Sequence, residues 1–279
     1  MKWSCLDITF DLSRFGEIMG IVNVTPDSFS DGGRFNTVKS AVERADQLIS
    51  EGAAIIDIGG ESTRPGAADV SVDEERDRVI PVVREICKKH PSICVSVDTT
   101  KAEVALAAVE EGARIINDVS GFRDPSMIAA AASTNAGVVA MHMQGTPRTM
   151  QKNPAYSDVV AEVREFFENK FEELVSAGVS AEAIAFDPGI GFGKSQSHNL
   201  SLLRDIESLI VQDRPILLGV SRKSFLGRIL ESDSIEDRSW PTVAITSFAR
   251  EKGVPLHRVH EVQKNLEALR MTEAILDAN

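Results

Sequence analysis

The sequence predicts a single-domain (β/α)8 barrel, and three observations carry this prediction. Short apolar runs alternate with helical patterns eight times between about residue 18 and the end of the 279-residue chain. No linker or change of composition divides these repeats, and the 43% hydrophobic content suffices for one large core. Strand–helix alternation requires a parallel sheet, and eight repeats within about 260 residues favour a closed barrel over a doubly wound sheet.

Eight strand–helix units are expected in order. The strands are expected at 18–24, 54–58, 93–98, 114–119, 138–141, 184–187, 216–220 and 256–260. The helices are expected at 37–51, 72–89, 101–111, 125–134, 156–177, 198–211, 240–252 and 262–277. Glycine follows several of these helices and supplies the left-handed cap that turns the chain back. Residues 1–17 are predicted to form a short extended lead-in at the barrel floor, where a hairpin is one possible form, and residues 18–279 the barrel domain.

Composition excludes several classes of partner. The formal charge of −12 and the pI near 5.0 argue against nucleic acid and anionic membranes. No apolar run approaches the roughly 20 residues that span a bilayer, and charged residues interrupt any signal-peptide pattern at the N-terminus. The three cysteines show no metal-ligand spacing. They predict reduced thiols and a cytoplasmic protein.

Polar side chains gather at the predicted C-terminal ends of the strands, where such barrels carry their chemistry. These strand-end residues are Asn23, Asp57, Asp98, Asn117, Met141, Asp187, Ser221, Arg258 and His260. Asp98, Asn117 and Asp187 together can present acceptors and an amide to a flat, nitrogen-rich heterocycle. The alternative is that each carboxylate pairs with a lysine or arginine of a neighbouring strand. Asp57 either binds ligand or only orients its neighbours.

Four cationic or imidazole side chains are expected on the same rim. Arg64 follows the second strand, Lys223 follows the seventh, and Arg258 and His260 lie on the eighth. Residues two apart in a strand share a face, so Arg258 and His260 point alike and a His257/His260 metal pair is disfavoured. The loops of strands seven and eight are the usual phosphate site of this fold, which favours a diphosphate ligand. A surface salt bridge is the alternative for each cation.

The glycine-rich segment DPGIGFGKS, residues 187–195, is not a nucleotide fingerprint. A P-loop needs glycine where Pro188 stands, and a dinucleotide motif needs glycine where Lys194 stands. The glycines are interpreted as allowing close approach to a flat ligand, with Phe192 as a wall; a plain tight turn is the alternative. The long loops after strands one and two, which carry Phe29, Asp31 and residues 63–66, are predicted to be lids or binding elements.

Eight motifs in chain order resemble the dihydropteroate synthase family. They are MGIVNVTPDSFSDGG, DIGGESTRPGA, SVDTTKAEV, IINDVSG, MHMQGTP, FDPGIGFGK, GVSRKSFLGR and RVHEV, and they extend from Met19 to the C-terminal helix. The resemblance implies a transferase that joins 6-hydroxymethyl-7,8-dihydropterin diphosphate to 4-aminobenzoate. The products are 7,8-dihydropteroate and pyrophosphate, in folate biosynthesis.

The resemblance also implies roles for individual residues, with Mg2+ as the cofactor. Pterin would be bound by Asp98, Asn117, Met141, Asp187 and Lys223. The diphosphate would be bound by Asn23, Thr63, Arg64, Arg258 and His260, with Asn23 also on the Mg2+. The 4-aminobenzoate pocket, where sulfonamides compete, would be lined by Phe29, Pro65, Phe192 and Ser224. Catalysis would depend on Asp31, Arg64 and Lys223.

The implied chemistry agrees with these side chains. Diphosphate leaves readily once Mg2+ and cations offset its charge, and an aniline nitrogen is already a nucleophile. We hypothesise that departure precedes attack and that Asp31 stabilises the resulting cation.

One segment departs from the family pattern. Trp240-Pro241 and Val254-Pro255 replace a small-residue helix start and a Gly-Ala strand start. In the family this region commonly forms a dimer contact, so a homodimer is implied and its geometry stays open. Two other functions are weighed: a pterin-binding methyltransferase domain, which has little use for diphosphate ligands, and a catalytically silent paralogue. The latter would be expected to lose Asn23, Arg64 or Lys223, and all three are present.

Overall fold

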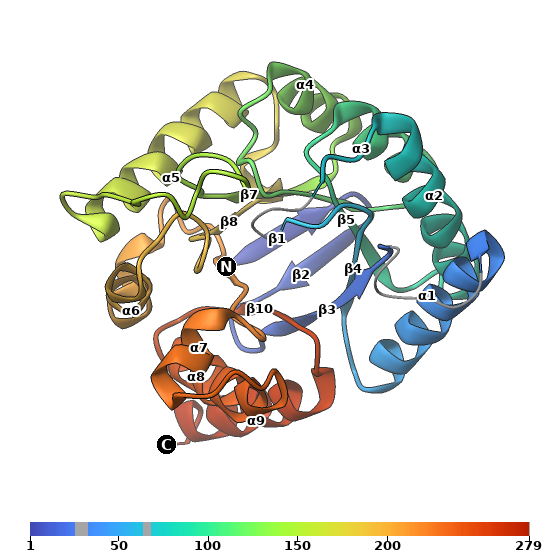
Figure 1. Cartoon of the computed structure of the whole chain (residues 1–279). Helices are drawn as coiled ribbons and strands as arrows, with labels where there is room; N and C mark the ends of the chain where they lie inside the picture. Colours follow the sequence, from blue (N-terminus) through green and yellow to red (C-terminus); the bar gives the residue numbers. More distant parts are fainter. Residues whose placement is uncertain (26–32, 64–67, 279) are drawn as a thin grey trace.

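The chain folds into the predicted (β/α)8 barrel. The computed structural model describes residues 1–25, 33–63 and 68–278. Eight parallel strands form one sheet in the order β8-β7-β6-β5-β4-β3-β10-β9 (Figure 1). Their bounds are β3 Glu17–Asn23, β4 Ile55–Gly59, β5 Cys94–Asp98, β6 Ile115–Asp118, β7 Gly137–Met141, β8 Ile184–Asp187, β9 Leu217–Leu218 and β10 Leu256–Val259. A parallel bridge between Phe186 and Ile216 joins β8 to β9 and nearly closes the ring.

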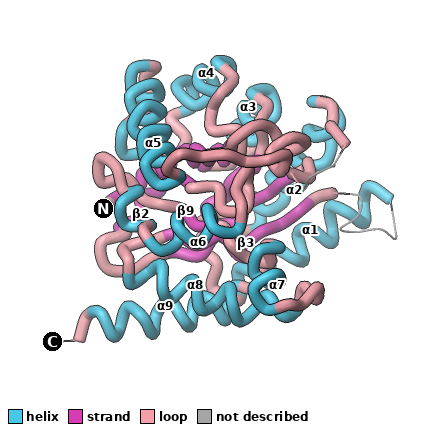
Figure 2. The backbone as a smooth tube through the Cα atoms, turned by 60° about the vertical axis from the view of Figure 1, so that its left-hand side comes forward, coloured by secondary structure: helices cyan, strands magenta, loops and turns pink. Residues whose placement is uncertain are grey.

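Helices surround this sheet on its outer side (Figures 1 and 2). Their bounds are α1 Gly33–Ser50, α2 Val72–Lys89, α3 Ala102–Glu110, α4 Pro125–Thr134, α5 Val159–Ser176, α6 Gln196–Arg204, α7 Ser224–Leu230, α8 Ser239–Glu251 and α9 Val262–Leu276. Gly52 and Gly112 have φ angles of 99° and 106°, so the predicted left-handed caps are present after α1 and α3. No helix of the described residues is long and apolar enough to cross a membrane.

The N-terminal segment forms an antiparallel hairpin of β1 Lys2–Cys5 and β2 Ile8–Asp11. The fully buried Trp3 donates its indole N–H to Ala183 O at 2.8 Å. Hairpin residues and the lower residues of the strands make one apolar cluster, which we call the barrel floor. It contains Trp3, Cys5, Leu12, Met19, Ile55, Cys94, Ile115, Val139, Ala185, Leu217 and Leu256.

Strand alternation places every second side chain inside the barrel. On β10, Leu256 belongs to the barrel floor and Arg258 contacts inward carboxylates, whereas Val259 packs in the core beneath the helices. His257 also differs in direction from Arg258 and is only 1% exposed. The predicted alternation is therefore observed for Arg258 and Val259.

The structure corrects the predicted elements most between residues 196 and 239. The seventh barrel strand, expected at 216–220, is β9 and has only two residues. Ser221 therefore lies beyond its end. The expected helix 198–211 breaks after Arg204 into a 3-10 helix, Ile206–Leu209. The segment expected as a loop after strand seven contains α7 and a further 3-10 helix, Glu236–Arg238.

Helix α5 also begins later than expected, at Val159 rather than at residue 156. The Asp158 carboxylate accepts hydrogen bonds from the amides of Val160 and Ala161, at 3.0 and 3.1 Å. This N-cap fixes the first turn, because it satisfies amides that no helical carbonyl reaches.

Candidate active site

An ion-pair cluster occupies the interior of the barrel above the floor. Arg258 on β10 contacts Asp57 through Nε and Asp98 through Nη2, each at 2.6 Å. The side chains of Asp57, Asp98 and Arg258 are 0%, 12% and 21% exposed. Burial lowers the pKa of Arg258, but the two carboxylates raise it further, so the guanidinium stays charged. Burial raises the pKa of Asp98 and Arg258 opposes that shift.

Asn117 at β6 joins this cluster from the next strand. Its Nδ2 donates to Asp57 Oδ2 at 3.3 Å, and β-pairing places it beside Asp98. Asp57 thus holds both the amide of Asn117 and the guanidinium of Arg258, and it lies inside β4 rather than at its end. Of the two roles open for Asp57, these contacts favour the orientation of its neighbours.

Asp187 and Lys223 are two further buried charged groups of the site, and each affects the pKa of the other. Burial raises the pKa of Asp187, and the positive charge of Lys223 is the largest effect against it. Burial lowers the pKa of Lys223 to about 8, and Asp187 opposes that shift. The Gly189 amide donates to Asp187 Oδ1 at 2.7 Å, which orients the carboxylate. Strand β8 and the segment before α7 thus bring two predicted pterin ligands together.

An apolar surface adjoins this pair. Met141 is 2% exposed and packs with Val119, Met143 and Met150 against the half-buried Phe192. Lys223 Nζ lies 4.2 Å from the centre of the Phe192 ring. A flat ligand bound between Asp187 and Lys223 would meet this surface.

The glycines of residues 189–193 have a different role from the one expected. Gly189, Gly191 and Gly193 all have positive φ angles. An added Cβ would lie 1.9 Å from His142 O at Gly189 and 2.6 Å from Gln144 O at Gly193. At Gly191 it would lie 3.0 Å from Lys223 Cδ. These glycines therefore accommodate the protein's own backbone and Lys223, a role that the sequence interpretation did not include.

The residues predicted to bind diphosphate lie around the same rim. Asn23 ends β3 and pairs with Gly59, and Thr63 follows β4; both are half-buried. His260 lies one residue after β10, where its Nδ1 and the Ser221 hydroxyl are 3.0 Å apart. Arg258, in contrast, already pairs with two carboxylates.

Five predicted site residues complete this account. Ser224 begins α7 and is exposed, with its hydroxyl 3.4 Å from Arg228 Nη1. Phe29, Asp31, Arg64 and Pro65 lie outside the described residues, so their predicted roles rest on the sequence alone.

The described residues contain no group of three His, Cys, Asp or Glu side chains placed to hold a metal ion. The oxygen donor predicted for Mg2+ is the single amide of Asn23. Magnesium commonly takes few protein ligands and completes its shell with substrate phosphates and water. The donor set therefore fits a magnesium ion that arrives with a diphosphate, and it does not fit a metal cage built by the protein.

Sequence reasoning missed a buried lysine behind the site. Lys194 is 2% exposed, and its Nζ lies 2.9 Å from His142 Nδ1 and 3.0 Å from Phe192 O. The sequence marks Lys194 only by its position directly after Gly193. That position excludes a dinucleotide motif but does not indicate burial. The ring of His142 packs against Tyr156 and Phe166.

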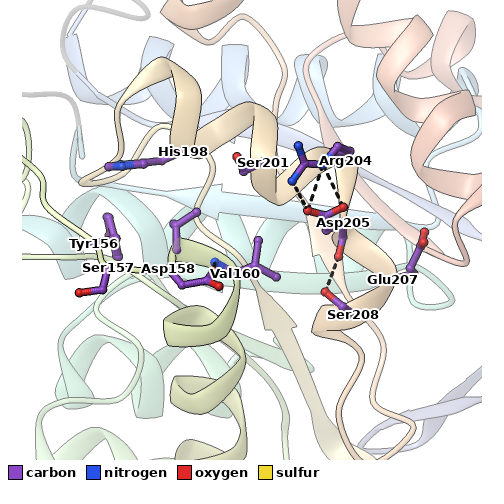
Figure 3. A pocket seen from close by; sticks show the side chains of 11 residues that line it. Tyr156, Ser157, Asp158, Val160, His198, Ser201, Arg204, Asp205, Glu207 and Ser208 are labelled. Carbon is purple, nitrogen blue, oxygen red and sulfur yellow. Dashed lines mark hydrogen bonds and ion pairs between the residues drawn. The ribbon is translucent and has the colours of Figure 1, made fainter.

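A separate cavity of about 600 Å³ lies on the outer flank, between the start of α5 and the end of α6 (Figure 3). Its polar groups largely satisfy one another. Arg204 pairs with Asp205 at 2.6 Å, and Asp158 caps α5. Tyr156 and His198 line the other end. The hydroxyl of Tyr156 donates to Gly193 O at 2.8 Å, which connects this flank to the glycine loop.

Fold and site together define a barrel whose upper interior suits a flat, polar heterocycle. Residues 19–260 match the family described as pterin binding enzyme. The chain is 46% identical to a dihydropteroate synthase of Escherichia coli K12 over 100% of this chain and 98% of the relative. A dihydropteroate synthase of Synechocystis is 42% identical over 95% and 92%.

Solved structures give the same result. A Yersinia pestis dihydropteroate synthase with a sulfonamide drug complex superposes with a TM-score of 0.93 at 43% identity, over 100% of both chains. A Xanthomonas albilineans dihydropteroate synthase with 4-aminobenzoic acid has a TM-score of 0.93 at 42% identity, over 100% of this chain and 99% of that one. The chain therefore belongs to the pterin-binding enzymes and, within them, to the dihydropteroate synthase family.

Proposed function

We propose that this protein is the transferase that joins 6-hydroxymethyl-7,8-dihydropterin diphosphate to 4-aminobenzoate. The C–O bond between the exocyclic carbon and the diphosphate breaks, and the amine nitrogen forms the new C–N bond. Pyrophosphate leaves with the electron pair, the amine releases one proton, and 7,8-dihydropteroate results. Relatives at 40–46% identity over nearly the whole chain support this activity.

The observation that carries the proposal is the arrangement of Asn117 on β6, Asp187 at the end of β8 and Lys223 directly before α7. Asp187 is held by the Gly189 amide and Asn117 by Asp57, so an acceptor and an amide are fixed before any ligand binds. A carboxylate can accept two parallel hydrogen bonds from an amino-pyrimidinone edge. Met141 and Phe192 supply the apolar contact for the rings.

The residues predicted for the reacting end lie at or after the ends of β3, β4 and β10. Three of them are half-buried: Asn23, Thr63 and His260. A diphosphate bound at this rim would contact their side chains. Magnesium bound with the diphosphate would offset the charge that grows on the leaving group. Asn23 would bind that ion through its amide oxygen, and His260 would hold the leaving group. Catalytic roles for Asp31 and Arg64 complete the proposal from the sequence.

One experiment tests the function directly. Purified protein, Mg2+, the pterin diphosphate and 4-aminobenzoate are mixed, and the release of pyrophosphate and dihydropteroate is measured. We expect one pyrophosphate for each dihydropteroate, inhibition by sulfonamides, and a strong loss in D187N, which keeps the shape but not the charge. Bound pterin without pyrophosphate release above background would overturn the proposal in favour of a silent paralogue.

We further propose that the protein is a cytoplasmic homodimer. Exposed apolar side chains on α8 and α9 support a self-association surface: Trp240 is 69% exposed, and Met271 and Ile275 are each 63% exposed. The two helices lie side by side in Figures 1 and 2. Light scattering after size-exclusion chromatography should give twice the 30.3 kDa chain mass, and W240E/M271E should give the monomer. A monomeric wild-type protein would contradict this.

A further inference from the structure

We infer that Lys194 is a positioning residue that fastens the glycine loop, residues 188–194, to the segment after β7 and so orients Asp187, Lys223 and Phe192. This inference rests on the proposed function only for the kinetic part of its test, in which KM and kcat are measured. It assigns a role to a buried lysine that has no predicted part in substrate binding.

The contacts of Lys194 satisfy all three of its N–H donors within the protein. Its Nζ lies 2.9 Å from His142 Nδ1, 3.0 Å from Phe192 O and 3.3 Å from His142 O. An ammonium group buried to this degree is costly unless each donor finds a partner. The partners are one imidazole nitrogen and two carbonyl oxygens. Hydrogen bonds rather than an ion pair therefore hold Lys194 in place.

The same lysine connects two strand ends. The His142 amide donates to Asp187 O at 2.9 Å, which continues the pairing of β7 with β8 by one residue. The His142 carbonyl then accepts from Lys194 at the far end of the glycine loop. The loop is therefore closed at both ends on His142.

Neighbouring contacts show how tightly this loop lies on the segment after β7. Gln151 Nε2 donates to Gly191 O at 2.7 Å, and Tyr156 donates to Gly193 O at 2.8 Å. Glycine at 189 and 193 is required by the approach to His142 O and Gln144 O. Of the side chains of Gln151, Tyr156 and Lys194, that of Lys194 is the one that is almost fully buried.

The loop in turn positions the groups predicted to bind substrate. Gly189 N donates to Asp187 Oδ1, and Ile190 O accepts from Lys223 Nζ. The Phe192 carbonyl is bound by Lys194 while its ring lies under Lys223 Nζ. Loosening the loop would therefore misplace a carboxylate, an ammonium and an aromatic wall together.

Burial and neighbouring charges also act on Lys194 and His142. Burial, then the charge of Lys223, lowers the pKa of Lys194 to about 7, and Asp187 opposes the shift. Burial and Lys194 lower the pKa of His142 to about 3, so the imidazole is neutral and Nδ1 can accept.

The test replaces Lys194 with methionine, which keeps the length and removes every donor. The matched control is K170M. Lys170 is 7% exposed and donates to Phe122 O at 2.8 Å, but it lies on α5 away from the glycine loop. Hydrogen exchange at the amides of residues 189–193 and steady-state kinetics are measured for both variants and the wild type.

We expect about tenfold faster exchange at Gly189, Gly191 and Phe192 in K194M, and about tenfold higher KM values for both substrates, near the 1.4 kcal/mol worth of one charge-assisted bond. The change in kcat should be smaller. K170M should leave both readouts near wild type even if its melting temperature falls. Wild-type exchange in K194M would overturn the inference, as would a raised KM without faster exchange. A wild-type protein that releases no pyrophosphate would refute the proposed function and leave the exchange test standing.

Discussion

The floor and the upper interior of the barrel are built from the same strands, yet their chemistry is opposite. On β4 the inward residues are Ile55 and then Asp57; on β5 they are Cys94, Ser96 and Asp98; on β10 they are Leu256 and Arg258. Two residues along a strand are about 6.6 Å, so an apolar core changes to a charged site over one or two side-chain layers.

This difference teaches that stability and function are separated along the strands. The floor is a cluster of apolar side chains and is sealed by the hairpin through Trp3, whose single polar side-chain atom is satisfied by Ala183 O. The upper interior buries charges whose cost is recovered only by mutual pairing. Substitutions in the two regions should therefore separate the free energy of unfolding from turnover.

The largest effect is expected for R258M in the upper interior. It removes the cation between Asp57 and Asp98 and leaves two buried carboxylates unpaired, which should lower the free energy of unfolding by about 3–5 kcal/mol. Activity should be lost as well, because Asp98 and Asn117 depend on this cluster. Urea unfolding and pyrophosphate release measure the two effects.

A second substitution sharpens the result for Arg258. D57N in the R258M background removes one of the two unpaired charges and should recover part of the lost stability. Surface substitutions usually change the free energy of unfolding by less than about 0.5 kcal/mol. If R258M changes it by no more than this, the ion-pair cluster does not stabilise the fold.

W3A should have a similar effect on stability and none on turnover. Removing a fully buried tryptophan from the floor leaves a cavity and should cost about 3–5 kcal/mol. The folded fraction should keep wild-type kcat and KM, because Trp3 touches the floor and Ala183 rather than the site. Kinetics at 10 °C, well below the transition, provide the check. A changed KM under those conditions would mean that floor and site are coupled.

The alternation of apolar runs predicted the barrel because the local pattern of apolar residues is enough to predict each strand and helix. Inward and outward faces followed from the period of two, as Arg258 and His257 show. The sequence did not reveal that Arg258 pairs with Asp57 and Asp98. The residue type of a strand-end aspartate does not tell whether its carboxylate binds a ligand or an arginine of the protein. Partners come from strand order and side-chain reach across the barrel.

The segment after strand seven was also mispredicted for a physical reason. Helix α7 has seven residues and no side-chain N-cap bond at Lys223, so it lacks the usual start signal. Strand β9 is only two residues long because its regular pairing to β10 involves Leu217 and Leu218 alone. Lys194 was missed since no local pattern marks a lysine that will be buried by another strand's loop.

A smaller, pH-dependent effect is expected at Lys223. Its pKa near 8 means that the ammonium is fully charged below pH 7 and loses its proton as pH rises through about 8. If the charge binds substrate, kcat/KM should be flat at low pH and fall above about 8. K223R keeps its charge at alkaline pH and should shift that fall upward, even with a lower plateau. An alkaline limb unchanged in K223R would assign the titration to another group.

The smallest effect is expected for S224A at the exposed start of α7. Among the described residues the Ser224 hydroxyl has the one 3.4 Å contact with Arg228, so its loss should not change the unfolding midpoint. If Ser224 lines the 4-aminobenzoate pocket, one hydrogen bond from an exposed hydroxyl, worth about 1 kcal/mol, should disappear, and KM for 4-aminobenzoate should rise about fivefold. KM for the pterin diphosphate should stay constant, because Asp187 and Lys223 are untouched. Equal KM values in S224A and wild type would place the 4-aminobenzoate carboxylate away from the start of α7, whereas a parallel rise in both would show that Ser224 acts through Lys223.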